Sequence, residues 1–275
     1  SCNARYSILK YIPSFMTVRK SRPVLFLTVI ILLLSNSLPA QSVDKPYYNF
    51  RQFTVTDGLS TNGVNYLCKD SRGFLWIGTK QGLQRFNGSS FLNFRHLNNY
   101  SSSIVNDRVS FIIEDTKHDI WVATNRGIAK FDYRNGKFTN YRMGWNDSGK
   151  VNMGDLFWLL EDSRGRLWAG GRAGLFLFNS KLDRFENLAQ KSIPGITLNH
   201  FIRVSSIKET AEKEIVFSVL DGFVIIDQEG NQQYFQMPVP DIKQPNHIPT
   251  NQVMVLKDYP DEVWVTANLN GLYKY

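Results

Sequence analysis

The chain has 275 residues, of which 43% are hydrophobic and 13% aromatic, which is enough apolar content for a substantial core. Its formal net charge of +8 is concentrated at one end: residues 1–40 contain five basic residues and no acidic one, and the remainder carries 27 basic and 24 acidic residues. Such a nearly balanced surface attracts phosphate backbones weakly, which excludes nucleic acid as an expected partner.

The basic N-terminal segment has the features of a secretory signal. Three basic residues precede the apolar run Val24–Leu34, and the small residue Ala40 follows. A run of this length is too short for a membrane-spanning helix, which needs about 20 residues, so we expect cleavage near Ala40. The residues before Met16 are treated as upstream sequence. The predicted organisation is upstream sequence plus a signal-peptide helix over residues 1–40 and a folded domain over residues 41–275.

Self-similarity is the strongest signal in the sequence. Three segments place an Asp, a Trp six residues later and a Gly six residues after that: DSRGFLWIGTKQGLQRF (Asp70–Phe86), DTKHDIWVATNRGIAKF (Asp115–Phe131) and DSRGRLWAGGRAGLFLF (Asp162–Phe178). A fourth copy has Val216 in the Trp position, and a fifth has Trp264. The anchor positions 76, 121, 168, 216 and 264 are 45, 47, 48 and 48 residues apart. A period in the forties with short strands is typical of propeller blades.

Each copy is predicted to form four short strands. In the first copy they are Val64–Lys69, Phe74–Thr79, Leu83–Asn87 and Phe91–Arg95. The second strand is apolar on both faces, as in a strand covered by neighbours on both sides, so we interpret the anchor tryptophans as core residues rather than sugar-stacking residues. We therefore expect an all-β propeller of five four-stranded blades, without helices beyond the leader.

Turn residues support these strand boundaries. In Asp70–Gly73 the Asp can accept a hydrogen bond from the backbone two residues on, and the Gly supplies a positive φ. Asn87-Gly88 predicts a two-residue hairpin between the third and fourth strands. Glycines recur between the second and third strands, where a Cβ would clash: they stand at positions 82, 127, 174, 222 and 271.

The first copy resembles the two-component regulator propeller repeat. The resemblance rests on the entry DGLS (Asp57–Ser60), the D-x-x-G-x-L-W-I-G-T core (Asp70–Thr79) and the tail G-L-x-R-F (Gly82–Phe86). It covers roughly residues 47–275. It implies the periplasmic sensor portion of hybrid two-component proteins of Bacteroidetes, in which a β-sandwich, a membrane span, a histidine kinase, a receiver and a DNA-binding domain follow the propeller. Kinase activity is therefore expected only of a longer parent chain.

The number of blades departs from the family pattern. Propellers of this family usually have seven blades, and five copies are visible here. We favour an N-terminal fragment cut within a seven-bladed ring. The alternative is that Tyr48–Val55 supplies a fourth strand to the fifth copy and closes a five-bladed ring.

Enzyme signals are weak. The four histidines lack metal-ligand spacing and are expected at the surface: they are His96, His118, His200 and His247. Gly170–Gly174 resembles a phosphate loop, but it is in register with Gly78–Gly82 and is interpreted as a turn of the repeat. Cys68 is expected to be a small buried hydrophobe. We expect no catalytic residue, metal or cofactor in this chain.

The candidate ligand surface is one rim of the propeller. Strand order places the blade-to-blade loops, notably Leu97–Arg108 and Arg142–Asp155, on the same rim as the turns between second and third strands. Residues that vary there between copies are free of scaffold roles and suit a polyhydroxylated or anionic ligand. The candidate ligand-binding residues are Lys80, Gln81, Asn125, Arg126, Trp145, Arg172, Asn268 and Asn270.

Three functions remain open. The leading hypothesis is a periplasmic, ligand-sensing propeller of a hybrid histidine kinase regulator that responds to oligosaccharide. The alternative is a secreted propeller that serves as a protein-interaction scaffold, and a propeller lyase or hydrolase ranks third. The leading hypothesis implies an oligosaccharide ligand, a downstream kinase module, a homodimer formed through the parent protein, and tethering to the inner membrane through further C-terminal parts.

Overall fold

The computed structural model describes residues 49–142, 156–188, 203–219, 222–237, 252–256, 259–267 and 271–274. The chain divides into two compact units, Ser1–Arg51 and Gln52–Tyr275. The expected signal peptide and its cleavage near Ala40 lie outside the described residues. Within the described ranges, no helix is long and apolar enough to cross a membrane.

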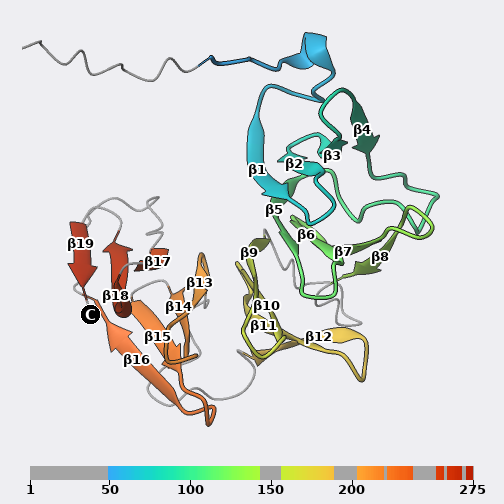
Figure 1. Cartoon of the computed structure of the whole chain (residues 1–275). Coiled ribbons are helices and arrows are strands. Elements are labelled where there is room, and N and C mark those ends of the chain that lie inside the picture. The colour runs from blue at the N-terminus through green and yellow to red at the C-terminus, as the bar shows by residue number, and fades with distance from the viewer. Residues whose placement is uncertain are drawn as a thin grey trace, which may run out of the picture. The chain divides into compact units, whose positions relative to one another are not determined.

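The second unit is built from five antiparallel sheets, which follow one another along the chain (Figure 1). Their strands are β1 (Val64–Lys69), β2 (Leu75–Thr79), β3 (Gly82–Phe86) and β4 (Phe91–Phe94); β5 (Val109–Glu114), β6 (Ile120–Thr124), β7 (Gly127–Asp132) and β8 (Lys137–Tyr141); β9 (Leu156–Glu161), β10 (Leu167–Gly171), β11 (Gly174–Asn179) and β12 (Arg184–Asn187); β13 (Ile207–Glu209), β14 (Ile215–Val219), β15 (Gly222–Ile226) and β16 (Gln232–Gln236); and β17 (Gln252–Leu256), β18 (Tyr259–Ala267) and β19 (Gly271–Lys274).

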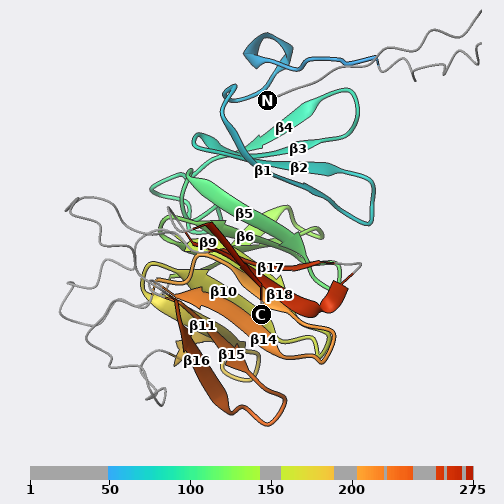
Figure 2. The same cartoon turned by 90° about the vertical axis from the view of Figure 1, so that its left-hand side faces the viewer.

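Each four-stranded sheet is a meander in which neighbouring strands pair in chain order, as β1 to β4 show in Figure 2. The register also repeats, because Trp76 pairs with Cys68 and Arg85 just as Trp121 pairs with Ile113 and Lys130. The predicted four-stranded blade is confirmed for four copies. The fifth sheet has three described strands, β17 to β19, and its fourth strand stays a prediction.

A short 3-10 helix, η1 (Val55–Asp57), contradicts the expectation of no helix beyond the leader. Its cause is local: the backbone N–H of Thr54 donates to the Asp57 carboxylate at 2.8 Å, and Gly58 ends the helix at a φ of +110°. Residues 49–54 form no strand. Phe53 instead packs edge-on against Phe86, with 5.3 Å between ring centroids. The described part of Tyr48–Val55 therefore covers the first sheet and adds no strand to the fifth.

The hairpin between β3 and β4 is longer than predicted from Asn87-Gly88. Its loop has four residues, Asn87 to Ser90, because the Asn87 side chain accepts hydrogen bonds from the backbone N–H groups of Ser89 and Ser90 at 2.9 and 2.8 Å. Gly88 still takes a positive φ of +98°. The side-chain bonds thus hold an Asx turn instead of a two-residue hairpin.

The core lies between successive sheets. Val109 and Ile112, on the first strand of the second sheet, are buried against Trp76 and Leu83 of the first. The close approach requires glycine, because a Cβ built on Gly78 would lie 2.7 Å from Val109 Cγ1. The same contact recurs between Gly170 and Val204 at 2.6 Å. In the first and third sheets, a glycine therefore leaves room for an aliphatic side chain of the next sheet and lets the two sheets pack closely.

Three of the four anchor tryptophans belong to this core, as predicted, and the fourth, Trp264, is half-buried. Trp76, Trp121 and Trp168 are at most 2% exposed, so their rings are unavailable for stacking on a sugar. Cys68 packs against the core as a hydrophobic residue, as expected, but it is half-buried instead of fully buried. Its position on the first strand of the sheet is also half-buried in the next two copies, where Ile113 and Leu160 stand.

Candidate functional site

The turns and linkers divide between the two ends of each meander. Because the strands pair in chain order, the second and third strands meet in a turn at the end where the linkers between sheets enter and leave. We call this end of the first two sheets the linker rim; it comprises residues 80–81, 95–108 and 125–126. The turns that join first to second and third to fourth strands lie at the opposite end.

The hydroxyl groups of buried threonines form hydrogen bonds with the backbone of the turns of the linker rim. Thr79 Oγ1 donates to the carbonyl of Gly82 at 2.9 Å and accepts from the N–H of Gln81 at 2.9 Å. Thr124 makes the same pair of bonds with Gly127 and Arg126, at 2.8 and 3.2 Å. Both threonines are fully buried. The two central residues of each turn are thereby fixed in backbone position while their side chains project outward.

The linker between the first two sheets is hydrogen-bonded to both turns. The N–H of Gly82 donates to the carbonyl of Asp107 at 2.8 Å, and the N–H of Asn125 donates to the carbonyl of Arg108 at 3.2 Å. Residues 80–81, 107–108 and 125–126 therefore form one continuous backbone surface across two sheets. The prediction that both loop sets share a rim is confirmed for Leu97–Arg108, while Arg142–Asp155 lies outside the described residues beyond Arg142.

Five of the eight predicted site residues are described. Lys80, Gln81 and Arg126 are exposed on the linker rim, and Asn125 beside them is half-buried. Arg172 is exposed in the equivalent β10–β11 turn, where the carbonyl of Gly171 accepts from the N–H of Val204 at 2.9 Å. The structure therefore brings together the first four of these residues. Trp145, Asn268 and Asn270 lie outside the described residues.

Sequence reasoning missed Arg108 and Asp107 as members of this surface. Arg108 is exposed next to the β6–β7 turn. Asp107 is half-buried, and its carboxylate accepts from the N–H of His96 at 2.7 Å. His96 is itself half-buried, with Nδ1 2.8 Å from the carbonyl of Ile104, which corrects its expected surface position. The exposed His118 agrees with the prediction, and His200 and His247 lie outside the described residues.

The opposite end of the first and third sheets carries a buried carboxylate, Asp70 or Asp162. Asp70 Oδ1 accepts from the N–H groups of Arg72 and Phe74 at 3.1 and 2.8 Å, as the turn prediction requires. Asp70 Oδ2 also accepts from the Trp76 indole N–H at 2.8 Å. The six-residue spacing of Asp and Trp in the repeat has its physical reason here. Sequence analysis identified the turn and missed this second role of the carboxylate.

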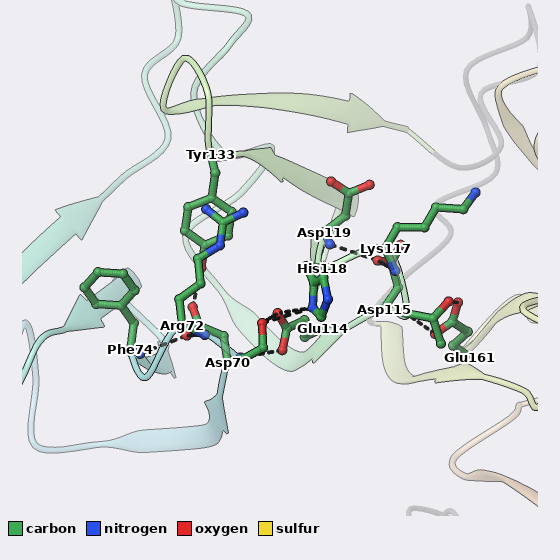
Figure 3. A network of polar contacts seen from close by, with 12 residues as sticks. Asp70, Arg72, Phe74, Glu114, Asp115, Lys117, His118, Asp119, Tyr133 and Glu161 are labelled. Atoms are coloured by element: carbon green, nitrogen blue, oxygen red, sulfur yellow. Dashed lines mark hydrogen bonds and ion pairs between the residues drawn. The ribbon is translucent and has the colours of Figure 1, made fainter.

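Tyr133 adds a bond from the second sheet to this carboxylate. Its hydroxyl donates to Asp70 Oδ2, and Figure 3 shows its ring beneath the guanidinium of Arg72, 3.7 Å from the ring centroid. Burial, with the hydrogen bond to Asp70 as the next cause, raises the pKa of Tyr133 far above its ordinary value. The hydroxyl therefore stays protonated and acts only as a structural donor at neutral pH.

A second polar contact between neighbouring sheets occurs three times. Glu114, at the end of β5, accepts from the N–H and hydroxyl of Ser71 at 2.7 and 2.5 Å. Glu161 accepts from Thr116 at 2.6 and 2.8 Å, and Glu209 from Ser163 at 2.8 and 2.7 Å. Figure 3 labels the acceptors of the first two contacts, Glu114 and Glu161. We call each of them a hydroxyl–Glu clamp.

The first clamp includes His118 and superficially resembles a Ser–His–Glu catalytic set. His118 Nδ1 lies 3.0 Å from Ser71 Oγ and 3.2 Å from Glu114 Oε1. A general base in such a set uses one ring nitrogen for the hydroxyl and the other for the carboxylate, whereas both partners here face Nδ1. The other two clamps lack a histidine at this place. The arrangement is therefore a structural contact. Within the described residues, no group of three or more His, Cys, Asp or Glu side chains could hold a metal ion.

The family described as two component regulator propeller matches residues 58–81. This stretch runs from the DGLS entry through Asp70 and Trp76 to the β2–β3 turn of the linker rim. Residues 58–81 therefore match the repeat of the two component regulator propeller family.

Among curated proteins, the chain is similar to histidine kinase P4 from Formosa agariphila. It is 37% identical over 79 residues, which are 29% of this chain and 6% of that protein. The chain thus matches only a small part of the length of this relative.

Two solved structures share the propeller fold. The extracellular domain of a hybrid two component system from B. thetaiotaomicron superimposes with a TM-score of 0.60 at 18% identity, covering 82% of this chain and 35% of that one. Virginiamycin B lyase from Staphylococcus aureus superimposes with a TM-score of 0.52 at 16% identity, covering 79% and 71%. Because a sensor domain and a lyase both match, these likenesses describe the fold alone.

Proposed function

We propose that this chain is the exported, ligand-sensing propeller of a two-component regulator and that its ligand is an oligosaccharide bound at the linker rim. The parent protein is tethered to the inner membrane and carries the histidine kinase module, and it dimerises through its other parts. The linker rim carries the proposal: four predicted site residues from two sheets lie on one hydrogen-bonded surface of a family whose name refers to two-component regulation.

The architecture of the linker rim supports ligand binding. Its turns are held by buried threonines, while their outward residues differ between copies, Lys80-Gln81 in one and Asn125-Arg126 in the next. A rigid backbone with variable polar side chains is the usual construction of a recognition surface. Amide and guanidinium groups donate hydrogen bonds to the hydroxyl groups of a sugar.

The test replaces Arg126 and Arg172 with Ala in the intact parent protein and measures oligosaccharide binding by calorimetry. We expect affinity to fall at least about tenfold, because each replacement removes a charged donor. Lys117→Ala, an exposed residue at the opposite end of the second sheet, is the matched control and should bind normally. Unchanged affinity in the double variant, with its fold intact by circular dichroism, would move the site elsewhere.

A second measurement separates sensing from a scaffold role. Autophosphorylation of the parent protein in membrane vesicles should change when the bound oligosaccharide is added. If a protein partner binds the propeller while oligosaccharides neither bind nor alter phosphorylation, the scaffold alternative replaces the sensor proposal.

A further inference from the structure

Basic side chains gather on the linker rim. Four exposed basic residues and one acidic residue lie there: Lys80, Arg95, Arg108, Arg126 and Asp107. The opposite end of the same two sheets is nearly balanced, with six basic and five acidic residues: Lys69, Arg72, Lys117, Lys130, Arg134 and Lys137 against Asp70, Glu114, Asp115, Asp119 and Asp132. The excess of positive charge is therefore larger at the linker rim, with four basic residues to one acidic residue, than at the opposite end.

The basic residues of the linker rim outnumber its one acidic residue by four to one. Among described residues, no ion pair involves Lys80, Arg108 or Arg126, whereas ion pairs at the opposite end include Arg134 with Asp132 and Lys130 with Asp119. The carboxylate of Asp107, the one acidic residue of the rim, accepts a hydrogen bond from the backbone N–H of His96 and offsets one of the four positive charges. A surface built this way attracts anions, since like charges held on a fixed backbone sum their fields.

The backbone holds three of these cations in one place. Lys80 precedes Gly82, whose N–H is bonded to the carbonyl of Asp107. Arg108 is the next residue after Asp107 in the chain. The carbonyl of Arg108 accepts a hydrogen bond from the backbone N–H of Asn125, the residue before Arg126. The cations thus come from two sheets and the linker between them, and each is attached to a segment bonded to the next.

We infer that the linker rim recognises an acidic oligosaccharide, one whose sugars carry carboxylate or sulfate groups, rather than a neutral one. This inference rests on the proposed function and names the chemical class of its ligand. Guanidinium groups match carboxylate and sulfate oxygens in charge and geometry. A neutral sugar would bring hydroxyl groups that leave these charges without a counterpart.

The experiment is an oligosaccharide array probed with the intact protein, on which each uronate-containing or sulfated glycan is printed beside its neutral counterpart. We expect binding to acidic members only, weakened when ionic strength rises from about 0.05 to 0.3 M. The variant K80Q/R108Q/R126Q should lose at least about tenfold in affinity for the acidic member that binds best. The variant K69Q/K117Q/K137Q removes the same charge from the opposite end and should bind like wild type.

The outcomes separate the two proposals. Binding to neutral members with equal or greater strength overturns the inference of an acidic ligand and leaves the sensor proposal standing. An equal loss in both triple variants also overturns it, because net charge rather than the rim would then be responsible. If no glycan binds, the proposed function fails together with the inference. R126K, which keeps the charge, should retain most of the binding lost in R126Q.

Discussion

At the scale of single residues, the central feature of the repeat is an Asp carboxylate. It accepts hydrogen bonds both from backbone N–H groups of its turn and from the indole N–H of the anchor Trp. Asp162 shows the pattern with an added cation: its Oδ2 accepts from the Trp168 indole at 2.9 Å and from Arg166 Nε at 2.6 Å. Burial by itself would raise the pKa of Asp162, but the bonds from Trp168 and Arg166 outweigh it and hold the pKa below its ordinary value. The charged form is thus the one that the fold stabilises.

Acid should therefore weaken this contact. Because the pKa of Asp162 is lower in the folded than in the unfolded chain, its contribution to stability is present above the ordinary value of 3.8 and is lost as pH falls below it. We expect Asp162→Asn to reduce the free energy of unfolding by about 1.5–3 kcal/mol at pH 7. The deficit should shrink between pH 4 and about pH 2.5, as measured by urea denaturation. Glu229→Gln, at an exposed turn position, is the control. A deficit that stays constant through this range contradicts the assignment.

At the scale of elements, the turn glycines differ in how much space surrounds the position that a Cβ would take. Gly127 has a φ of +143°, and a Cβ built on it would lie 2.4 Å from the carbonyl oxygen of Tyr141. Gly136 also has a positive φ, of +69°, but its Cβ would meet nothing within 4 Å. The first therefore closes a crowded turn, and the second only sets a backbone angle.

This difference predicts unequal costs for the same substitution. Gly136→Ala should cost about 1–2 kcal/mol, the strain of a left-handed backbone. Gly127→Ala should cost clearly more, because the obstacle is a backbone atom of β8 that cannot rotate away. Thermal and urea unfolding of the two variants gives the comparison. Equal costs would mean that the β6–β7 turn relaxes freely.

The hydroxyl–Glu clamps should couple neighbouring sheets. Ser163 and Glu209 belong to the third and fourth sheets and share two hydrogen bonds. We expect Ser163→Ala and Glu209→Gln to be non-additive, with a coupling of about 0.5–1.5 kcal/mol in a double-mutant cycle. Additive effects would mean that the exposed clamp contributes nothing measurable to the interface.

At the scale of the whole molecule, the first sheet presents a face that the other sheets bury. Leu67 is 54% exposed, whereas its equivalents Ile112, Leu159 and Ile207 are at most 1% exposed. Val64 is 41% exposed, and its equivalent Val109 is fully buried. An apolar pair shaped to pack on a neighbouring sheet is an association surface when nothing covers it.

We therefore expect the isolated chain to self-associate in sedimentation and light-scattering measurements. Leu67→Ser should reduce association with little effect on stability, while Leu159→Ser should unfold the domain, since core truncations cost about 2–5 kcal/mol. A monodisperse, cooperatively melting monomer would contradict this prediction.

The strands, their grouping into sheets and the positions of the turns could be predicted from the sequence alone. The period set by Trp76, Trp121 and Trp168 determined the sheets and their core strands, because each blade repeats the same local pattern of Asp, Trp and Gly at fixed spacing. The positions of the turns followed from glycine and Asx chemistry, which is local. These features need only neighbours in the chain, so periodicity and turn residues were sufficient to predict them.

Tertiary structure alone decided which residues meet. Asp107 and Arg108 look like ordinary loop residues, and only the hydrogen bonds to Gly82 and Asn125 place them on the linker rim. The pairing of Glu114 with Ser71 joins residues 43 positions apart, and the exposure of Leu67 depends on whether another sheet covers it. Such contacts are set by the packing of one sheet on the next, and a single sequence does not reveal which side chains that packing brings together.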